Sequence, residues 1–123
     1  MIGYVTLGTN DFERAKAFYD AALAGLGAKR TLSWERMQCW GTSRGPMLAV
    51  CLPFNGEKAF AGNGNMVALA APSPQIIQKV HADALAAGAT DDGPPGDRGG
   101  GFYGAYFRDP DGNKVCIYKM SAS

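Results

Sequence analysis

Histidine and cysteine are both scarce in this chain of 123 residues. His81 is the single histidine, and the three cysteines form no CxxC pair. A lone histidine excludes the imidazole-rich sites that hold most borderline divalent ions. The odd number and wide spacing of Cys39, Cys51 and Cys116 argue against a disulfide scaffold and favour reduced thiols in the cytoplasm.

The chain also has no excess of charge of one sign and no long apolar run. Twelve basic residues nearly balance eleven acidic ones, so the formal net charge is +1. Without a strongly basic surface, nucleic acids and anionic membranes are not expected as partners. No apolar run approaches the roughly 18 residues that span a bilayer, and the first residues do not resemble a signal peptide. We therefore expect a cytoplasmic protein.

What is present is the composition of one globular domain. Hydrophobic residues make up 46% of the chain and charged residues 19%, which are ordinary values for such a domain. The length is sufficient to bury a core. Glycine is abundant, with 17 residues, and this predicts many tight turns between short elements.

The first half of the chain predicts a strand, a helix and three further strands. Residues 2–7 are β-branched and aromatic, as is typical of a strand. A helix follows, in which Asn10 is the expected cap and Glu13 completes a capping box. Gly25 and Gly27 are expected to end this helix. The three further strands are predicted at 31–34, 37–41 and 47–52.

The second half predicts the same order of elements after a linker rich in turn residues. A strand is expected at 66–70, and a helix that begins with Ser73 and Pro74 and ends at Gly88. Residues 91–101, rich in glycine, proline and aspartate, are expected to form a loop. The last two strands are predicted at 102–107 and 114–119.

The two halves are related by an internal repeat. At an offset of 62 positions, Val5 aligns with Val67, and residues 22–24 align with residues 84–86. Strand, cap, helix and glycine stop recur in one order, which chance does not easily produce. The sequence therefore predicts an α+β fold of two tandem βαβββ modules whose curved sheets enclose a cleft, a natural ligand site. Within one domain, the expected parts are module 1 at about 1–54, a linker at about 55–63 and module 2 at about 64–120.

Three stretches of the sequence resemble the vicinal oxygen chelate superfamily, which groups glyoxalase I, bleomycin and fosfomycin resistance proteins, and extradiol dioxygenases. These stretches are residues 5–19, 62–68 and 106–113, and the resemblance extends over nearly the whole chain. The most specific is the Asp-Pro-Asp-Gly-Asn turn at 109–113, in which proline fixes one turn position and Gly112 supplies a positive φ. The resemblance implies a homodimer, and in some members the cleft is built from two chains.

Relatives in this family use a divalent metal, held by His and Glu side chains, to stabilise an enolate or a related anion of the substrate. Carried onto this sequence, three ligand positions fall on Tyr4, Met66 and Cys116. The fourth lies in the strand at 47–52, which has no Asp, Glu or His. A phenol, a thioether and a thiol do not make up the usual imidazole and carboxylate set. We therefore expect a protein without the metal and without any other cofactor.

The ligand-binding residues that we predict for the cleft are aromatic or contain sulfur: Tyr4, Trp34, Trp40, Met66, Tyr106 and Cys116. Aromatic walls suit planar or apolar ligands, although core packing explains each residue singly as well. Tyr4 is either a donor to a substrate oxygen or a core aromatic. Cys116 is either a thiolate nucleophile or a small buried hydrophobe, and we favour the second.

Three further side chains are weaker candidates. His81 is expected on the surface of the second helix with no partner in reach. Arg36 and Arg98 could bind an anionic group, Arg98 from a flexible loop acting as a lid, but solvated arginines are the simpler expectation.

Two functions remain open from the sequence. The first is a metal-free binding protein of the bleomycin-resistance sort, which holds a small, partly apolar or aromatic molecule. The second is a glyoxalase-like enzyme of the lyase, isomerase or dioxygenase class, with an atypical metal site or metal-free chemistry at Tyr4 and Cys116. A purely structural domain is a third interpretation, and no residue names the ligand or is assigned as catalytic.

Overall fold

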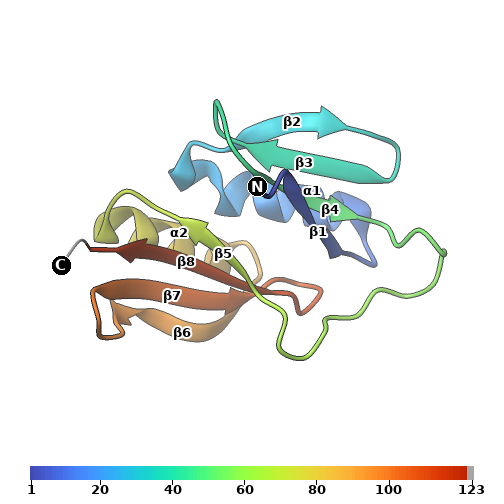
Figure 1. Cartoon of the computed structure of the whole chain (residues 1–123). Helices are drawn as coiled ribbons and strands as arrows, with labels where there is room; N and C mark the ends of the chain where they lie inside the picture. Colours follow the sequence, from blue (N-terminus) through green and yellow to red (C-terminus); the bar gives the residue numbers. More distant parts are fainter. Residues whose placement is uncertain (122–123) are drawn as a thin grey trace.

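Within residues 1–121, which the computed structural model describes, the chain forms two βαβββ modules (Figure 1). The first module contains β1 (Tyr4–Gly8), α1 (Phe12–Ala22), the short 3-10 helix η1 (Ala24–Leu26), β2 (Lys29–Ser33), β3 (Met37–Gly41) and β4 (Met47–Cys51). The second module contains β5 (Val67–Ala70), α2 (Pro74–Ala86), β6 (Thr90–Asp97), β7 (Phe102–Arg108) and β8 (Lys114–Met120). Residues 52–66 connect the modules without a helix or strand.

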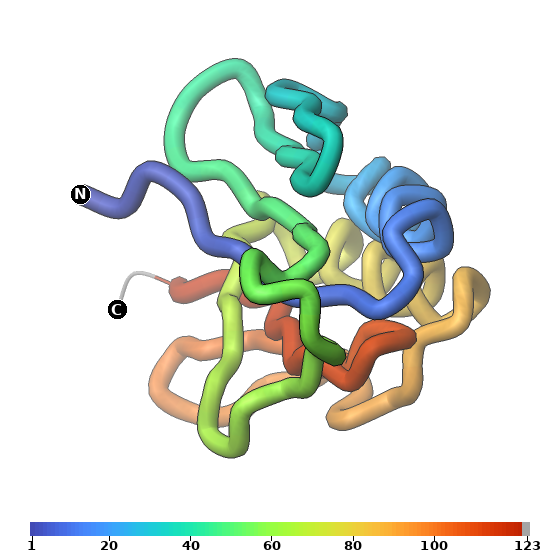
Figure 2. Tube along the Cα trace, turned by 90° about the vertical axis from the view of Figure 1, so that its right-hand side faces the viewer, coloured from blue at the N-terminus to red at the C-terminus, as the bar shows by residue number. Residues whose placement is uncertain are grey.

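Each module supplies one four-stranded sheet, and the two sheets have the same topology. The strand orders are β1-β4-β3-β2 and β5-β8-β7-β6. In each sheet the first strand pairs with the last in parallel, and the other pairs are antiparallel. Figure 2 shows both helices on one side of the sheets. The other side of each sheet, which we call the open face, is covered by neither helix. The predicted α+β fold of two modules is therefore confirmed.

The core lies between the helices and the helix-facing side of both sheets. The helices contribute Ala15, Phe18, Tyr19, Ala22, Ile77, Val80 and Ala84. The strands contribute alternate residues, among them Trp40, Leu48, Val50, Ala105, Phe107, Val115 and Ile117. Because successive side chains of a strand point to opposite faces, the residues between these belong to the open faces. No helix within residues 1–121 is long and apolar enough to cross a membrane.

The helix ends differ from the sequence expectation at both ends of α1. Helix α1 ends at Ala22 with Leu23 as its C-cap, and Gly27 ends the following η1 instead. Asp11, not Asn10, caps α1, and its Oδ1 accepts a hydrogen bond from the Arg14 N–H at 3.1 Å. The Asn10 side chain instead binds both backbone groups of Ala59. The Asn10 prediction was wrong because either residue can cap a helix, and the contact with the linker decides between them. Ser73 caps α2 with Pro74 at its first position, as predicted.

The segment predicted as a loop at 91–101 is largely strand β6, so that prediction was wrong. Pro94 and Pro95 lie inside β6, which is an edge strand of its sheet. A proline at an edge removes no ladder hydrogen bond that the sheet requires. The register shifts near Gly93 and Gly96 mark irregularities at which β6 keeps its pairing with β7.

His81 is buried rather than exposed, which corrects the expectation of a surface histidine. Its side chain lies on the inner side of α2, and the residue is only 5% exposed. Nε2 lies 3.1 Å from Asp91 Oδ1 on β6. A partner ten residues ahead could not be foreseen, because residues 91–101 were expected to form a loop.

The Asp-Pro-Asp-Gly-Asn turn joins the second module to the first. Asp111 accepts hydrogen bonds from Thr9 Oγ1 at 2.6 Å, from the Asn10 N–H at 3.0 Å and from Arg14 Nη2 at 2.9 Å. Asn113 Nδ2 donates to the Gly8 carbonyl at 2.9 Å. These contacts hold the end of β1 and the start of α1 against the second module, so the turn positions β1 beside β5.

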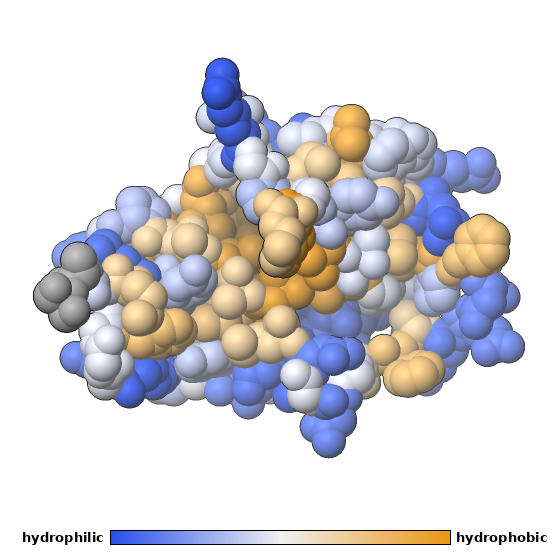
Figure 3. Space-filling model, viewed as in Figure 1, coloured by the Kyte–Doolittle hydropathy of each residue, from blue (hydrophilic) through white to orange (hydrophobic). Residues whose placement is uncertain are grey.

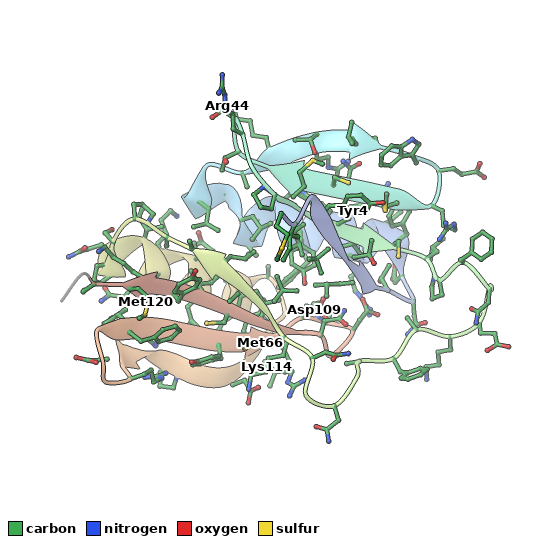
Figure 4. The ribbon with its side chains drawn as sticks, viewed as in Figure 1. Tyr4, Arg44, Met66, Asp109, Lys114 and Met120 are labelled. Atoms are coloured by element: carbon green, nitrogen blue, oxygen red, sulfur yellow. The ribbon has the colours of Figure 1, made fainter. Side chains whose placement is uncertain are left out.

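The buried carboxylate of Asp109 completes this junction (Figure 4). Its oxygens accept from the Asp111 and Asn113 N–H groups, from Asn113 Nδ2 and from Tyr19 Oη at 2.6 Å. Burial, and next the charge of Asp109, raise the pKa of Tyr19 well above its usual value. The tyrosine is therefore a neutral donor that ties α1 to the turn.

Candidate functional site

A groove runs between β1 and β5, the edge strands at which the two sheets approach one another. One end is a pocket of about 460 Å³, lined by Val5–Gly8, residues of the 60–67 segment, Asn113 and Lys114. The other end is a pocket of about 320 Å³, lined by Ile2, Val5, residues 46–48 and residues 66–69. We call these two pockets together the central groove. Figure 3 shows that apolar side chains gather between the sheets on this side of the molecule.

The groove is built from residues of both modules. Val5 and Met66 line both of its ends, so they lie where the two pockets join. Val5 and Val67 occupy equivalent positions of the internal repeat and both line the groove, and Val67 also packs against the core. The smaller end is mainly apolar, whereas Thr6, Asn65, Asn113 and Lys114 give the larger end a more polar lining. A concave site between two modules that combines apolar surface with polar groups is a usual setting for a small-molecule ligand.

The open face of the second module carries aromatic rings. Phe102 and Tyr118 stack with their centroids 5.3 Å apart and their planes at 1°. Tyr106 lies farther along β7, directly opposite Cys116 on β8. We call Phe102, Tyr106 and Tyr118 the aromatic platform. Flat rings of this kind suit planar ligands, because offset stacking is favourable.

The open face of the first module is different in character. Cys39 and Gly41 on β3 share this face with Met47, Ala49 and Cys51 on β4, which are their neighbours across the sheet. A Cβ atom placed on Gly41 would lie 3.1 Å from Met47 Cγ. The side chains on this face are therefore small or contain sulfur. The two open faces differ in this respect although the modules repeat.

The three positions that correspond to metal ligands in the family do not come together as one cluster. Met66 lines the central groove and is 46% exposed. Tyr4 is 53% exposed at the start of β1 and is not among the residues that line either end of the groove. Cys116 is 0% exposed and lies under the open face of β8. Of the three, only Met66 is placed to touch a molecule in the groove.

Cys116 has the environment of a buried thiol rather than a nucleophile. Burial raises its pKa, although hydrogen bonding to Tyr106 and the charges of Arg98 and Lys114 act in the opposite direction. A thiol with a raised pKa is protonated at neutral pH, whereas the reactive form is the thiolate. This favours the interpretation of Cys116 as a small buried hydrophobe.

The predicted tryptophans lie apart from the central groove. Trp40 is 1% exposed and packs on the helix side of its sheet, where Nε1 donates to Asp20 Oδ1 at 2.9 Å. Its ring is a core residue because its cross-strand partner Leu48 also faces the helices. Trp34 is exposed in the turn between β2 and β3, beside Arg36. Tyr106 lies on the open face, as part of the aromatic platform.

The two arginines singled out in the sequence are held by carbonyl groups. Arg36 Nη1 donates to the Leu52 carbonyl at 2.6 Å. Arg98 Nη2 donates to the Pro94 carbonyl, and its backbone N–H donates to the Phe102 carbonyl at 2.8 Å. Arg98 therefore belongs to the tight turn that joins β6 to β7, which replaces the flexible lid that the sequence suggested.

The side chains present do not fit the divalent metal that relatives of this fold use. Within residues 1–121, no three His, Cys, Asp or Glu side chains gather closely enough to hold an ion. The corresponding positions carry a phenol, a thioether and a buried thiol, and the strand β4 carries no carboxylate or imidazole. Hard and borderline ions prefer oxygen and imidazole ligands. These positions therefore lack the donor set for such an ion.

One groove residue was missed in the sequence, although a signal for it existed. Lys114 lies two positions before Cys116 on β8, so the alternation of the strand places both on the open face. The structure places Lys114 in the lining of the groove near Met66 (Figure 4). Lys114 was not predicted because it does not occupy a metal-ligand position of the family.

The comparisons with known proteins agree with the fold. The profile of the Glyoxalase/Bleomycin resistance protein/Dioxygenase superfamily matches residues 1–117. A glyoxalase/bleomycin resistance protein from Albidiferax ferrireducens T118 is 38% identical, with a TM-score of 0.90 over 96% of this chain and 97% of that one. A glyoxalase-related enzyme from Fulvimarina pelagi is 22% identical, with a TM-score of 0.76 over 96% of this chain and 86% of that one, and shows the fold alone. No curated protein matches the chain.

Proposed function

Because the chain belongs to the Glyoxalase/Bleomycin resistance protein/Dioxygenase superfamily, we propose that it binds a small, partly apolar or aromatic molecule in the central groove, without the usual divalent metal. The observation that carries this proposal is the groove itself, whose smaller end has an apolar lining from both modules and whose larger end includes Lys114, the neighbour of the Tyr106 ring. The residues at the metal-ligand positions support a metal-free site, since they lack imidazole and carboxylate groups. The protein would act by holding its ligand.

The competing function is an enzyme that recruits a metal or uses Tyr4 and Cys116 directly. Burial of Cys116 and its raised pKa weigh against the direct chemistry. We therefore retain binding as the proposal, and leave the enzyme as the outcome that the experiment below would reveal.

Metal content distinguishes the two functions. Protein purified without added metal is analysed for Zn, Ni, Mn and Fe, and its thermal unfolding is followed before and after treatment with a chelator. We expect far less than one metal per chain and an unchanged melting temperature, because the proposed site has no ligand set for the ion. A stoichiometric metal whose removal lowers the melting temperature would show that the proposal is wrong.

We also propose that the protein is a cytoplasmic homodimer. Nine large apolar side chains are exposed among the described residues: Met1, Ile2, Tyr4, Leu32, Trp34, Phe54, Phe60, Met66 and Met120. Exposed apolar area of this kind favours association. The three cysteines are free, which suits a reducing compartment. Light scattering should give twice the 13.0 kDa mass of the chain, and a concentration-independent monomer would exclude the dimer.

A further inference from the structure

Two cations flank one ring of the aromatic platform. The Arg98 guanidinium carbon lies 5.4 Å from the centroid of the Tyr106 ring, and Lys114 Nζ lies 5.3 Å from the same centroid. Tyr106 is also the cross-strand partner of the buried Cys116. Tyr106 therefore connects the positive end of the open face with its aromatic part.

The cations on this face outnumber the carboxylates that face them. Asp92 Oδ2 lies 3.3 Å from Lys114 Nζ and 3.1 Å from Arg108 Nε, so one carboxylate serves two cations. Within residues 1–121, Arg98 forms no ion pair, and the Pro94 carbonyl is the side-chain hydrogen-bond acceptor that the structure shows for it. The neighbouring Asp97 is engaged with the Gly99 N–H at 2.7 Å. The face thus has positive charge left over for an anion.

Glycines in β6 and β7 shape this surface. A Cβ atom on Gly93 would lie 2.7 Å from Tyr106 Cδ2, and one on Gly104 would lie 2.7 Å from Phe102 Cε1. A Cβ atom on Gly96 would lie 2.9 Å from an Arg98 guanidinium nitrogen. Because these three residues are glycines without a Cβ atom, the rings and the guanidinium can lie close to the sheet. The glycine-rich sequence therefore serves the flat platform as well as the turns.

We infer that the ligand of this protein is a planar, apolar molecule with a carboxylate group, which Arg98 and Lys114 hold beside the aromatic platform. Lys114 lines the central groove together with Met66, so the charged site and the groove are continuous (Figure 4). The carboxylate would lie toward the second module, and the apolar body would extend over the platform and into the groove. This inference rests on the proposed function, since it assigns the charge of the same ligand.

The chemistry of the two cations suits a carboxylate. A guanidinium offers a planar pair of N–H donors that matches the two carboxylate oxygens, and an ammonium adds a point charge. Neither side chain is deeply buried, so neither has to lose all its water before a ligand arrives. In the family a metal ion supplies positive charge for substrate oxygens. In this protein the Arg98 and Lys114 side chains would supply that charge.

The test compares naphthoate, an aromatic carboxylate, with naphthamide, its neutral counterpart of the same shape. Binding to the full chain is measured by calorimetry and by amide chemical shifts at low ionic strength. We expect naphthoate to bind about tenfold more tightly or better, since hydrogen bonds to an ionised carboxylate are stronger than those to a neutral amide. Arg98→Gln and Lys114→Gln should each remove most of this preference.

Lys119→Gln is the matched control, because Lys119 is on the same strand as Lys114 but points to the other face. It should leave the preference unchanged. Equal binding of naphthoate and naphthamide, or a preference that survives both substitutions, would overturn the inference and leave the proposed function standing. Binding of neither probe would count against both.

Discussion

The junction between the modules provides the most direct prediction from the structure, through the substitution Asp111→Ala. The Asp111 carboxylate is 4% exposed and receives hydrogen bonds from Thr9, Asn10 and Arg14 of the first module. Alanine removes all three acceptor contacts at once. We expect the variant to lose stability and to hold the end of β1 less firmly beside the groove.

The size of the effect follows from the charge and burial of the carboxylate. A hydrogen bond to an ionised group contributes about 1.5–3 kcal/mol, and leaving a buried donor without a partner costs a similar amount. Arg14 is about half exposed, so its contribution is screened and small. The Thr9 hydroxyl can still donate to the Asp11 carbonyl at 3.0 Å, which lessens the loss. We therefore expect the free energy of unfolding to fall by about 2–4 kcal/mol.

Urea unfolding followed by tryptophan fluorescence measures this change. With an m-value of about 2 kcal/mol per molar, the midpoint should fall by about 1–2 M. Asp83→Ala is the matched control: Asp83 forms a surface pair with Lys79 one helical turn away. Such a pair is worth about 0.3–0.5 kcal/mol, so this variant should stay close to the wild type. If Asp111→Ala were no less stable than Asp83→Ala, the account of the junction would be refuted.

Three further predictions concern single side chains. The pKa of Tyr19 is raised in the folded protein, so the neutral phenol stabilises the fold below pH ~10, and this stability is lost as the pH rises further. The variant Tyr19→Phe should therefore be less stable than the wild type at neutral pH. Its unfolding midpoint should also fall less between neutral and alkaline pH. A steeper alkaline fall in Tyr19→Phe would refute this. Burial raises the pKa of Cys39 and Cys116, so a thiol reagent followed by mass spectrometry should modify Cys51 first, and equal labelling of Cys116 would be inconsistent with its burial. Gly93→Ala should destabilise the protein by about 1–3 kcal/mol, because Gly93 has a φ of 153° and the added Cβ would meet Tyr106; unchanged urea unfolding would contradict this.

The fold followed from sequence wherever a local pattern decides the structure. The helix that begins at Ser73 and the strand that begins at Met47 were predicted from capping and from apolar composition, and both start at those points in the structure. Strand β6 was missed because glycine and proline indicate a loop locally, whereas pairing with β7 supplies its hydrogen bonds. That interaction is non-local, so no pattern within residues 91–101 reveals it.

The candidate site was harder to predict than the fold. The burial of Trp40 depends on which face of β3 packs against the helices. The sequence of a strand of five residues does not indicate which face this is. The burial of Cys116 depends on the packing of β8 between β5 and β7, where its cross-strand partners are Ala68 and Tyr106. Lys114 could have been found from its spacing with Cys116. The aromatic platform depends on Gly93 of β6 and Gly104 of β7, whose roles appear only when Tyr106 and Phe102 lie over them.

A fragment screen on chelator-treated protein tests the central claim most directly. Amide chemical shifts are recorded with a set of small planar aromatic compounds and with divalent metals removed. The account predicts that the compounds that bind perturb the amides of Val5, Met66 and Val67, which line the central groove. It is contradicted if binding occurs only after a divalent metal is added back, or if the perturbed amides lie elsewhere on the surface.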